Sequence, residues 1–432
     1  MRAMKDSGID WIGQIPQGWH VDRLKYCANL DSEKLSEKTD PEYAFNYIDI
    51  SSVTEYGGIG STQEMTFDKS PSRARMVVRN GDTIISTVRT YLKAIAYIDG
   101  LEDHICSTGF CVVTPNEKLH PKFGYYLLQS DYFVQKIVSE SVGVSYPAIS
   151  STEIGNMSIA IPAPEEQLTI ACYLDNKCAE IDALIAAKEK TNALLKERRQ
   201  SVIFEAVTKG LNPDTPMKDS GIEWIGQIPS EWDVIRIKHL RNGEENSFED
   251  GDWIEAPYIS EAGIRYLTTG NIGDGIYKDQ GNGFVAQETF DVLKCKYAYP
   301  GDLVFSRLNA PYGRACILPN YYSEYVLAVD NVILRTDHCK KFICYLTQCT
   351  GYQRIVEEKA NGTTMKRISR TNLGDIALPI PTLAEQEVIA IYLDTECAAT
   401  DAVISANEAT INKLKEYRQS IIYEAVTGKI EV

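Results

Sequence analysis

Two stretches of the chain, 165–209 and 384–427, carry apolar residues at alternating spacings of three and four, the pattern of an amphipathic helix. Neither contains proline or glycine, and Leu, Ala, Glu and Lys dominate both. A helix of this length extends roughly 65 Å, more than one globular domain needs for its core. We therefore expect the two helices to form an antiparallel coiled coil. The alternative is that each folds back on its own domain.

The apolar positions of these helices form a heptad seam with polar breaks near its middle and its end. The expected coiled-coil positions are Leu174, Ile181, Ile185, Leu195 and Val202 in the first helix and Leu393, Ile404, Ile411, Leu414 and Ile421 in the second.

The segments that precede each helix contain short runs of β-forming residues, separated by Gly, Asn and Asp turns. Strand-like runs lie at 76–78, 82–86, 110–114, 302–306 and 331–336. One amphipathic helix is expected near 122–138 and another near 341–357. The predicted fold class is α/β (α+β).

The chain also repeats itself. MKDSGIDWIGQIPQGWHVDRLKY at 4–26 matches 217–239, and 165–210 aligns without gaps with 384–429. The chain is thus a tandem duplication, which predicts two globular domains in a pseudo-twofold repeat, separated by the two long helices. The expected boundaries are 1–160 for the first domain, 161–210 for the first spacer helix, 211–379 for a linker and the second domain, and 380–432 for the second spacer helix.

The repeated opening motif is nearly identical in the two halves, whereas the middle regions differ at polar positions such as Thr87 and Arg307. We expect Trp11 and Trp224, and Trp19 and Trp232, to be apolar anchors of domain packing. A contact with a partner subunit is the alternative role. The middle regions should then form two different recognition surfaces on one scaffold.

Charge and cysteine content restrict the possible partners. A net charge of −16 argues against nucleic-acid binding unless a locally basic face exists. Eleven cysteines without a C-x-x-C pair favour free thiols in a reducing cell over a zinc site. No apolar run approaches the ~20 residues of a membrane helix, and the first ten residues lack the apolar core of a secretory signal, so a cytoplasmic location is expected.

The sequence offers little support for catalysis. A G-x-x-x-x-G-K-[ST] motif is absent, and the GIG at 58–60 lacks the strand–helix frame of a cofactor-binding turn. Glu357-Glu358-Lys359 has the spacing of a nuclease E-x-K, but the single Pro-Asp pair lies in the linker at 213–214. We therefore expect a protein that is not catalytic on its own.

The doubled plan resembles the specificity (S) subunit of Type I restriction–modification enzymes. The resemblance rests on the opening motif of each half, on IPAPEEQ at 161–167 and LPIPTLAEQ at 378–386, on the YLD that follows each, and on the tails RQSVIFEAVTKG and RQSIIYEAVTGK. It covers nearly the whole chain. It implies two target-recognition domains that read the halves of a split, asymmetric site in double-stranded DNA, with the coiled coil setting the gap.

The resemblance also implies partners. Family members assemble with two methyltransferase (M) subunits, which carry S-adenosylmethionine, and with motor–nuclease (R) subunits, which use ATP and Mg²⁺. No cofactor or metal is expected in this chain itself.

Charge, aromatic and glycine content select candidate DNA-binding residues, since Arg and Asn can pair with base edges and Lys and Thr contact the backbone. Arg307, Arg314 and the stretch 363–367 stand out, because they lie in glycine-punctuated loops where the halves differ. Each candidate could instead be an ordinary solvated residue. The complete set is Arg73, Arg75, Arg89, Tyr91, Lys93, Ser145 and Tyr146 in the first domain and Arg307, Asn309, Tyr312, Arg314, Thr363, Thr364, Lys366, Arg367 and Arg370 in the second.

Two other functions stay open at this point: a coiled-coil scaffold that binds protein alone, and a self-sufficient enzyme.

Overall fold

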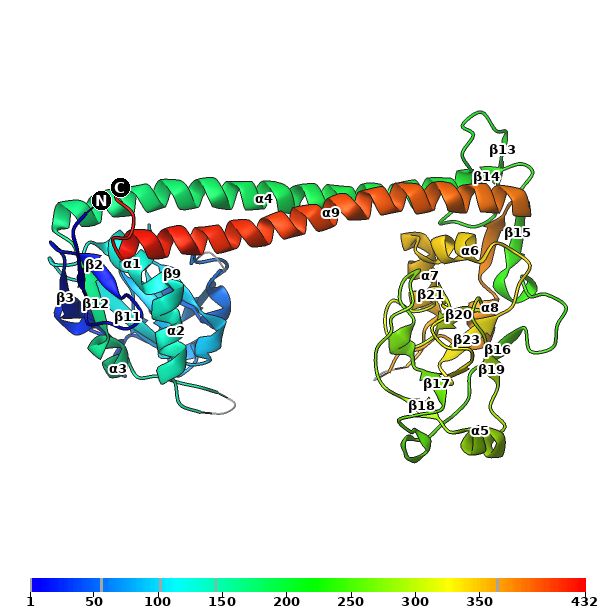
Figure 1. Cartoon of the computed structure of the whole chain (residues 1–432), viewed down its shortest axis with the longest axis horizontal. Coiled ribbons are helices and arrows are strands. Elements are labelled where there is room, and N and C mark those ends of the chain that lie inside the picture. Colours follow the sequence, from blue (N-terminus) through cyan, green and yellow to red (C-terminus); the bar gives the residue numbers. More distant parts are fainter. Residues whose placement is uncertain (1, 55–56, 101–102, 144–145, 363–364) are drawn as a thin grey trace. The chain divides into compact units, whose positions relative to one another are not determined.

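The computed structural model describes residues 2–54, 57–100, 103–143, 146–362 and 365–432. Its internal contacts divide the chain into two units, Met1–Glu189 with Asn407–Val432 and Lys190–Ala406. Both divisions fall inside the long helices (Figure 1). Each unit therefore holds one globular domain, the start of the helix that follows it and the end of the other long helix.

The long helices are α4 (Pro164–Lys209) and α9 (Leu383–Val426). Glu165 and Glu166 occupy the first turn of α4, where a negative charge complements the helix dipole. In the first unit Asp182 and Lys188 of α4 bind Arg418 and Asn407 of α9, at 2.9 and 3.0 Å. These pairs run in opposite directions along the two helices, which are therefore antiparallel.

Most residues of the predicted seam face both the partner helix and a domain. Among its positions, Leu195, Val202 and Leu414 are half-buried. The buried positions are Leu174, Ile181, Ile185, Leu393, Ile404, Ile411 and Ile421. Many of these side chains belong to the same hydrophobic clusters as the domains, so each helix packs on its partner helix and on a domain at once.

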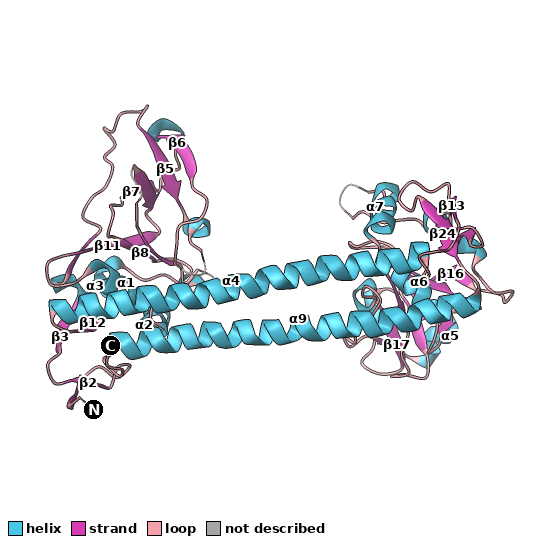
Figure 2. Cartoon of the chain, turned by 90° about the horizontal axis from the view of Figure 1, so that it is seen from above, coloured by secondary structure: helices cyan, strands magenta, loops and turns pink. Residues whose placement is uncertain are grey.

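The first domain contains two four-stranded sheets. The proximal sheet, β4-β11-β8-β9, is antiparallel throughout, and the distal sheet, β6-β5-β10-β7, contains one parallel pair, β5 with β10. In Figure 2 the distal sheet lies farther from the helices. The strands are β1 (Met4–Asp6), β2 (Gln14–Pro16), β3 (His20–Arg23), β4 (Ala28–Leu30), β5 (Ala44–Ile48), β6 (Gln63–Thr66), β7 (Ala74–Val77), β8 (Thr83–Ser86), β9 (Ile95–Tyr97), β10 (His104–Ser107), β11 (Phe110–Pro115) and β12 (Ser158–Ile161); the short helices are α1 (Pro121–Gln129), α2 (Asp131–Glu140) and α3 (Ser151–Asn156).

The second domain repeats this topology. Its proximal sheet is β16-β23-β20-β21, and its distal sheet, β18-β17-β22-β19, again has one parallel pair, β17 with β22. The strands are β13 (Met217–Asp219), β14 (Gln227–Pro229), β15 (Asp233–Arg236), β16 (Phe248–Asp250), β17 (Ile264–Leu267), β18 (Phe284–Val285), β19 (Tyr297–Ala298), β20 (Leu303–Ser306), β21 (Ala315–Ile317), β22 (Tyr325–Leu327), β23 (Asn331–Leu334) and β24 (Ala377–Ile380); the short helices are α5 (Gln287–Leu293), α6 (Lys340–Thr347), α7 (Thr350–Lys359) and α8 (Arg370–Gly374).

The single amphipathic helices expected near 122–138 and 341–357 are each broken into two. Ser130 separates α1 from α2 with an extended backbone (ψ 137°), and its hydroxyl donates to the Leu127 carbonyl at 2.7 Å. Such a side chain competes with the helix for backbone groups. The break turns α2 away from the buried α1, a detail that apolar periodicity did not predict.

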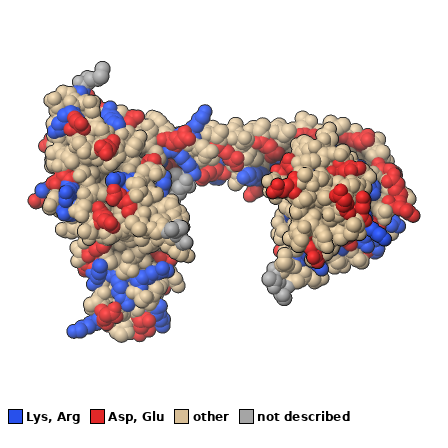
Figure 3. Space-filling view, turned by 60° about the horizontal axis from the view of Figure 1, so that its bottom comes forward, with Lys and Arg blue, Asp and Glu red and all other residues tan. Residues whose placement is uncertain are grey.

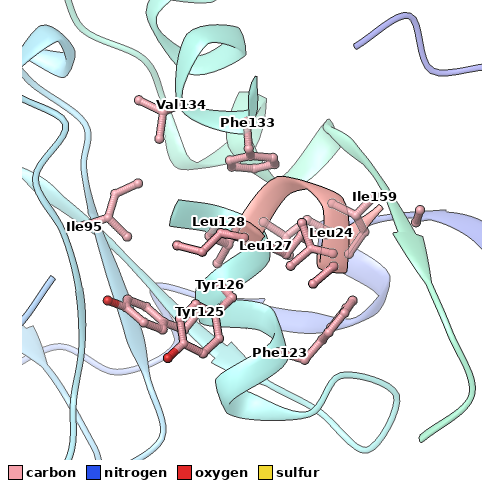
Figure 4. Close-up of a cluster of buried hydrophobic side chains, with 14 of the residues drawn as sticks. Leu24, Ile95, Phe123, Tyr125, Tyr126, Leu127, Leu128, Phe133, Val134 and Ile159 are labelled. Atoms are coloured by element: carbon pink, nitrogen blue, oxygen red, sulfur yellow. The ribbon is translucent and has the colours of Figure 1, made fainter. Parts of the chain in front are cut away.

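The core of the first unit surrounds α1, which is buried on nearly every side. Figure 4 shows Phe123, Leu127 and Leu128 of α1 among side chains from strands and from α2. The same cluster includes Leu174 and Ile185 of α4 and the end of α9. An equivalent cluster around α6 forms the core of the second unit.

The repeated opening motif folds identically in both units. In each copy it forms a two-stranded antiparallel ribbon, in which Met4 pairs with Pro16 and Met217 with Pro229. Trp19 and Trp232 are both only 1% exposed. Each packs edge-on against a phenylalanine of the first domain helix, with ring centroids 6.4 Å apart. These contacts support the packing role of the motif.

Candidate nucleic-acid interface

Two loops come together on each domain. In the first, loop 87–94 follows β8, and loop 141–149 joins α2 to α3. The Arg89 amide donates to the Pro147 carbonyl and the Ile149 amide to the Thr87 carbonyl, both at 2.9 Å. We refer to these two segments, and to 307–314 and 360–368 in the second domain, as the paired loops.

The second domain joins its paired loops in the same way. The Ile368 amide donates to the Arg307 carbonyl at 3.0 Å, and Leu308 bridges to Arg367. The sequence predicted functional residues in all four loops, and the structure shows that the described parts of these loops meet in pairs. The scaffold beneath the two surfaces is therefore the same.

The paired loops of the first domain border a cleft of about 1200 Å³. Two residues of loop 87–94 that line the cleft, Arg89 and Lys93, have left-handed backbone conformations, with φ of 51° and 52°. The Arg89 guanidinium lies 4.9 Å from the centre of the Tyr146 ring. From the candidate set, the cleft is lined by Arg73, Arg89, Lys93 and Tyr146.

The remaining candidates of the first domain differ in accessibility. Tyr91 is 53% exposed on loop 87–94. Arg75 is half-buried, because its guanidinium stacks on Phe67 and donates to the Ala74 carbonyl at 2.9 Å. Lys93 is exposed but pairs with Asp131 at 2.8 Å. Ser145 lies outside the described residues.

Arg307 and Arg314, two of the candidates for DNA binding, do not face outward in this structure. Arg307 is 8% exposed, donates to the Val329 carbonyl at 2.5 Å and lies 3.1 Å from Asp250. Arg314, also 8% exposed, donates to the carbonyls of Ile272, Thr269, Asn309 and Pro311. Burial lowers the pKa of Arg314, and the nearby Asp274 carboxylate opposes this shift. Both guanidinium groups hold loops together.

The other candidates of the second domain form a more exposed surface. Asn309 lies in a left-handed turn (φ 62°), and Lys366 is exposed on the second loop. Arg367 is exposed and lies 3.3 Å from Asp330. The half-buried candidates are Tyr312, which packs on the core, and Arg370, which lies 3.5 Å from Asp250. Thr363 and Thr364 lie outside the described residues.

The sequence did not assign the end of α9 to this surface. Lys415, Arg418 and Gln419 of α9 line the cleft of the first unit. The only sequence signal for them was the polar break that Arg418 makes in the apolar seam. Its neighbour in the cleft, Gln129, lies almost three hundred residues earlier in the chain, too far for any local pattern to connect them.

Local charge differs from the net charge. In Figure 3, Lys and Arg side chains gather at the end of the first unit formed by the distal sheet, whereas Asp and Glu are more prominent on the visible face of the second unit. Exposed basic residues on or beside the distal strands include Lys69, Arg73 and Arg79. The chain thus has a negative net charge but also a locally basic surface.

Within the described ranges, His, Cys, Asp and Glu form no group of three that could hold a metal ion. The helices described here include none that is long and apolar enough to span a membrane. Each of the eleven cysteines is a free thiol.

A family model described as the Type I restriction modification DNA specificity domain matches the chain twice, over residues 16–196 and 229–415. The chain belongs to this family. The two matches cover both domains and most of both long helices, in agreement with the duplication. As a Type I specificity subunit, the chain is a non-catalytic DNA-recognition subunit.

Relatives support the same assignment along nearly the full length. A putative type I restriction enzyme MjaX specificity subunit from Methanocaldococcus jannaschii is 25% identical over 446 residues, which cover 98% of this chain and 96% of the relative. The type I restriction enzyme EcoDI specificity subunit of Escherichia coli is 21% identical, and the match covers 97% of this chain and 90% of the relative.

Solved structures agree with the fold of the specificity subunit. A chain from a study of complex assembly and conformational transition in the type I R-M system has a TM-score of 0.75 and 25% identity, with 96% of this chain and 99% of that chain covered. The HsdS subunit from Thermoanaerobacter tengcongensis has a TM-score of 0.53 and 25% identity, with 96% of this chain and 98% of that chain covered. The predicted fold class, two recognition domains with paired long helices, is confirmed.

Proposed function

We propose that each unit of this specificity subunit reads one half of a bipartite, asymmetric site in double-stranded DNA through its paired loops. One observation carries the proposal: both units build the same two-loop frame, but different side chains face outward from it. The first presents Arg89 against Tyr146, and the second presents Asn309 and Lys366. Arginine pairs best with guanine and asparagine with adenine, so the two surfaces suit different half-sites.

The long helices are proposed to set the gap between the half-sites and to provide the surface on which two methyltransferase subunits dock. The antiparallel pairing of α4 and α9 within each unit supports this role. In this proposal S-adenosylmethionine belongs to the methyltransferase subunits, and ATP and Mg²⁺ belong to motor–nuclease subunits of the same complex.

Selection from random-sequence duplexes tests the proposal. A complex reconstituted with the methyltransferase subunits should enrich a bipartite motif with a fixed gap. Enrichment of no such motif would leave only the protein-binding scaffold. Methylation or cleavage by the purified chain alone would instead favour the self-sufficient enzyme.

Arg89→Ala should weaken discrimination at one base position of one half-site by about 1–3 kcal/mol, because one side chain contacts one base edge. The other half-site should be unaffected. Competition binding with single-base variants of the selected site measures this loss. A matched variant, Asn309→Ala, should affect the opposite half-site. An equal loss on all sequences would reassign Arg89 to a phosphate contact.

A second prediction concerns the gap. The variant has seven residues inserted after Glu189 in α4 and seven after Ala406 in α9. Both insertions lie where the two units divide, so both domains stay intact. Because a heptad adds roughly 10 Å of helix, the preferred gap should lengthen by about three base pairs. The selection described above measures the gap. An insertion of the same length in the exposed loop after Asn242 is the control, and an unchanged gap in the helix variant would contradict the proposal.

A further inference from the structure

A charged contact recurs in both units between the two long helices. In the first unit, Arg418 Nε donates to Asp182 Oδ1 at 2.9 Å, and Arg418 Nη1 donates to Gln129 Oε1 at 3.4 Å. Arg418 is 5% exposed. The arginine belongs to α9, whereas the aspartate belongs to α4 and the glutamine ends α1. Three segments of the first unit thus meet at one guanidinium group.

The second unit brings the corresponding residues together, although Arg199 Nε makes an ion pair there and no hydrogen bond. Arg199 Nε of α4 lies 3.1 Å from Asp401 Oδ1 of α9, and Arg199 Nη1 donates to Gln348 Oε1 at 3.3 Å. Gln348 directly follows α6. In each unit the arginine comes from the helix that follows the other domain in the sequence.

Each glutamine also touches a glycine turn from the distal sheet. Gly57 lies between β5 and β6, and Gly275 lies between β17 and β18, with φ of +79° and +77°. A Cβ atom added to Gly57 would lie 2.2 Å from the Tyr125 hydroxyl and 2.6 Å from Gln129 Nε2, and one added to Gly275 would collide with the Gln348 amide. A contact chain therefore runs from the distal sheet through Gln and Arg to Asp on the second helix.

The energetics of this arrangement favour a positioning role. In the first unit Arg418 is buried, and burying a charged group costs desolvation that the attraction to Asp182 barely offsets, so an apolar seam residue would stabilise the helices as well or better. In the second unit the pair is more accessible, with the Arg199 and Asp401 side chains 22% and 56% exposed. Both copies nevertheless retain Arg, Asp and Gln, although neighbouring positions differ, such as Arg198 and Tyr417. A guanidinium fork fixes the direction of its partners, which a simple apolar contact does not.

The contact chain also reaches the recognition surface. Gln129 and Arg418 line the cleft of the first unit together with Arg89 and Tyr146 of the paired loops. A change in the angle between the domain and the helices would therefore shift the paired loops as well.

We propose that the Gly–Gln–Arg–Asp chain of each unit is a positioning device, which fixes the angle of its recognition domain on the helix pair. Through that angle, Arg418 and Arg199 determine how tightly the gap is specified and how well each half-site is read. This inference rests on the proposed function, since it needs a bipartite site.

The test compares Arg418→Gln and Arg199→Gln with the parent chain, each in complex with the methyltransferase subunits, by selection from random duplexes. Arg418→Gln should lower discrimination at the half-site of the first domain on the order of tenfold, widen the range of accepted gaps, and leave the other half-site unchanged. Arg199→Gln should produce the mirror result. Arg198→Gln and Lys413→Gln, exposed residues on the same helices, are the matched controls.

A second variant disrupts the contact chain at its glycine end. Gly57→Ala should displace Gln129 together with the Tyr125 hydroxyl, in a turn where φ is +79°. It should reproduce the effect of Arg418→Gln at the half-site of the first domain, and the double variant should lose little more than either single one, because both break the same contact chain. Hydrogen exchange separates positioning from unfolding, since the first domain should keep its protected core.

Two failures are distinguishable. If the parent complex selects no bipartite motif, the proposed function fails. If it does, but the arginine variants keep the parental gap range and half-site preferences, or lose both half-sites equally, the positioning role fails.

Discussion

Replacing Trp232 with alanine is expected to lower the free energy of unfolding of the second unit by about 3–5 kcal/mol, the usual cost of removing a fully buried aromatic side chain. Trp232 packs edge-on against Phe342, and its indole nitrogen donates to Glu385 Oε2 at 3.0 Å. Gly210, which directly follows α4, lies close to the same ring. These neighbours belong to three separate segments, so the cavity cannot collapse cheaply.

Denaturant titration of the full chain, read by hydrogen exchange of peptides from the second unit, measures this loss. Trp253→Ala is the matched control, because Trp253 is in the same unit but 72% exposed. It should change the stability by less than about 0.5 kcal/mol. A Trp232 variant as stable as this control would show that the opening motif does not anchor the domain, and would favour the alternative role as a partner contact.

Arg314→Ala should destabilise the second unit by about 3–5 kcal/mol, the range found when one partner of a buried charged network is removed. The substitution leaves four backbone carbonyls, from the turn at 269–272 and the loop at 309–311, without their donor. Arg314→Lys should recover little, because one ammonium group cannot match the planar fork of five donors.

The same hydrogen-exchange measurement, combined with half-site selection, separates a structural arginine from a reading one. Lys366→Ala provides the contrast, since Lys366 is exposed on the paired loops and should leave stability unchanged. If Arg314→Ala kept the parental stability and altered a base preference instead, the assignment of Arg314 to loop support would be wrong.

Trp232 and Arg314 show how far sequence reasoning reaches. Trp232 was identified as an anchor because it recurs in a nearly invariant motif, and an invariant position between two drifted domains indicates the shared scaffold. The sequence makes Arg314 a candidate for DNA binding because it lies where the copies differ. A difference between copies also arises when each loop is held together by different internal hydrogen bonds. Sequence comparison cannot distinguish such a structural difference from a difference in the DNA that is read.

The broken helix at Ser130 gives the same lesson for local structure. Apolar periodicity continues through 122–138, and nothing in its spacing indicates the turn. The break depends on a serine hydroxyl that bonds to its own backbone in a fully buried setting. Burial is a tertiary property, so the choice between helix and turn was made by packing.

The sequence by itself determined the duplication, the two long helices, the sheet-forming runs and the family, because these depend on periodicity and on motifs that are read within one segment. Only the tertiary structure decided which polar side chains face outward. Arg307 and Arg314 bind acceptors contributed by other segments, and Arg418 meets a partner 236 residues away. The direction of a long charged side chain is set by the acceptors that folding brings within reach, and no local pattern encodes them.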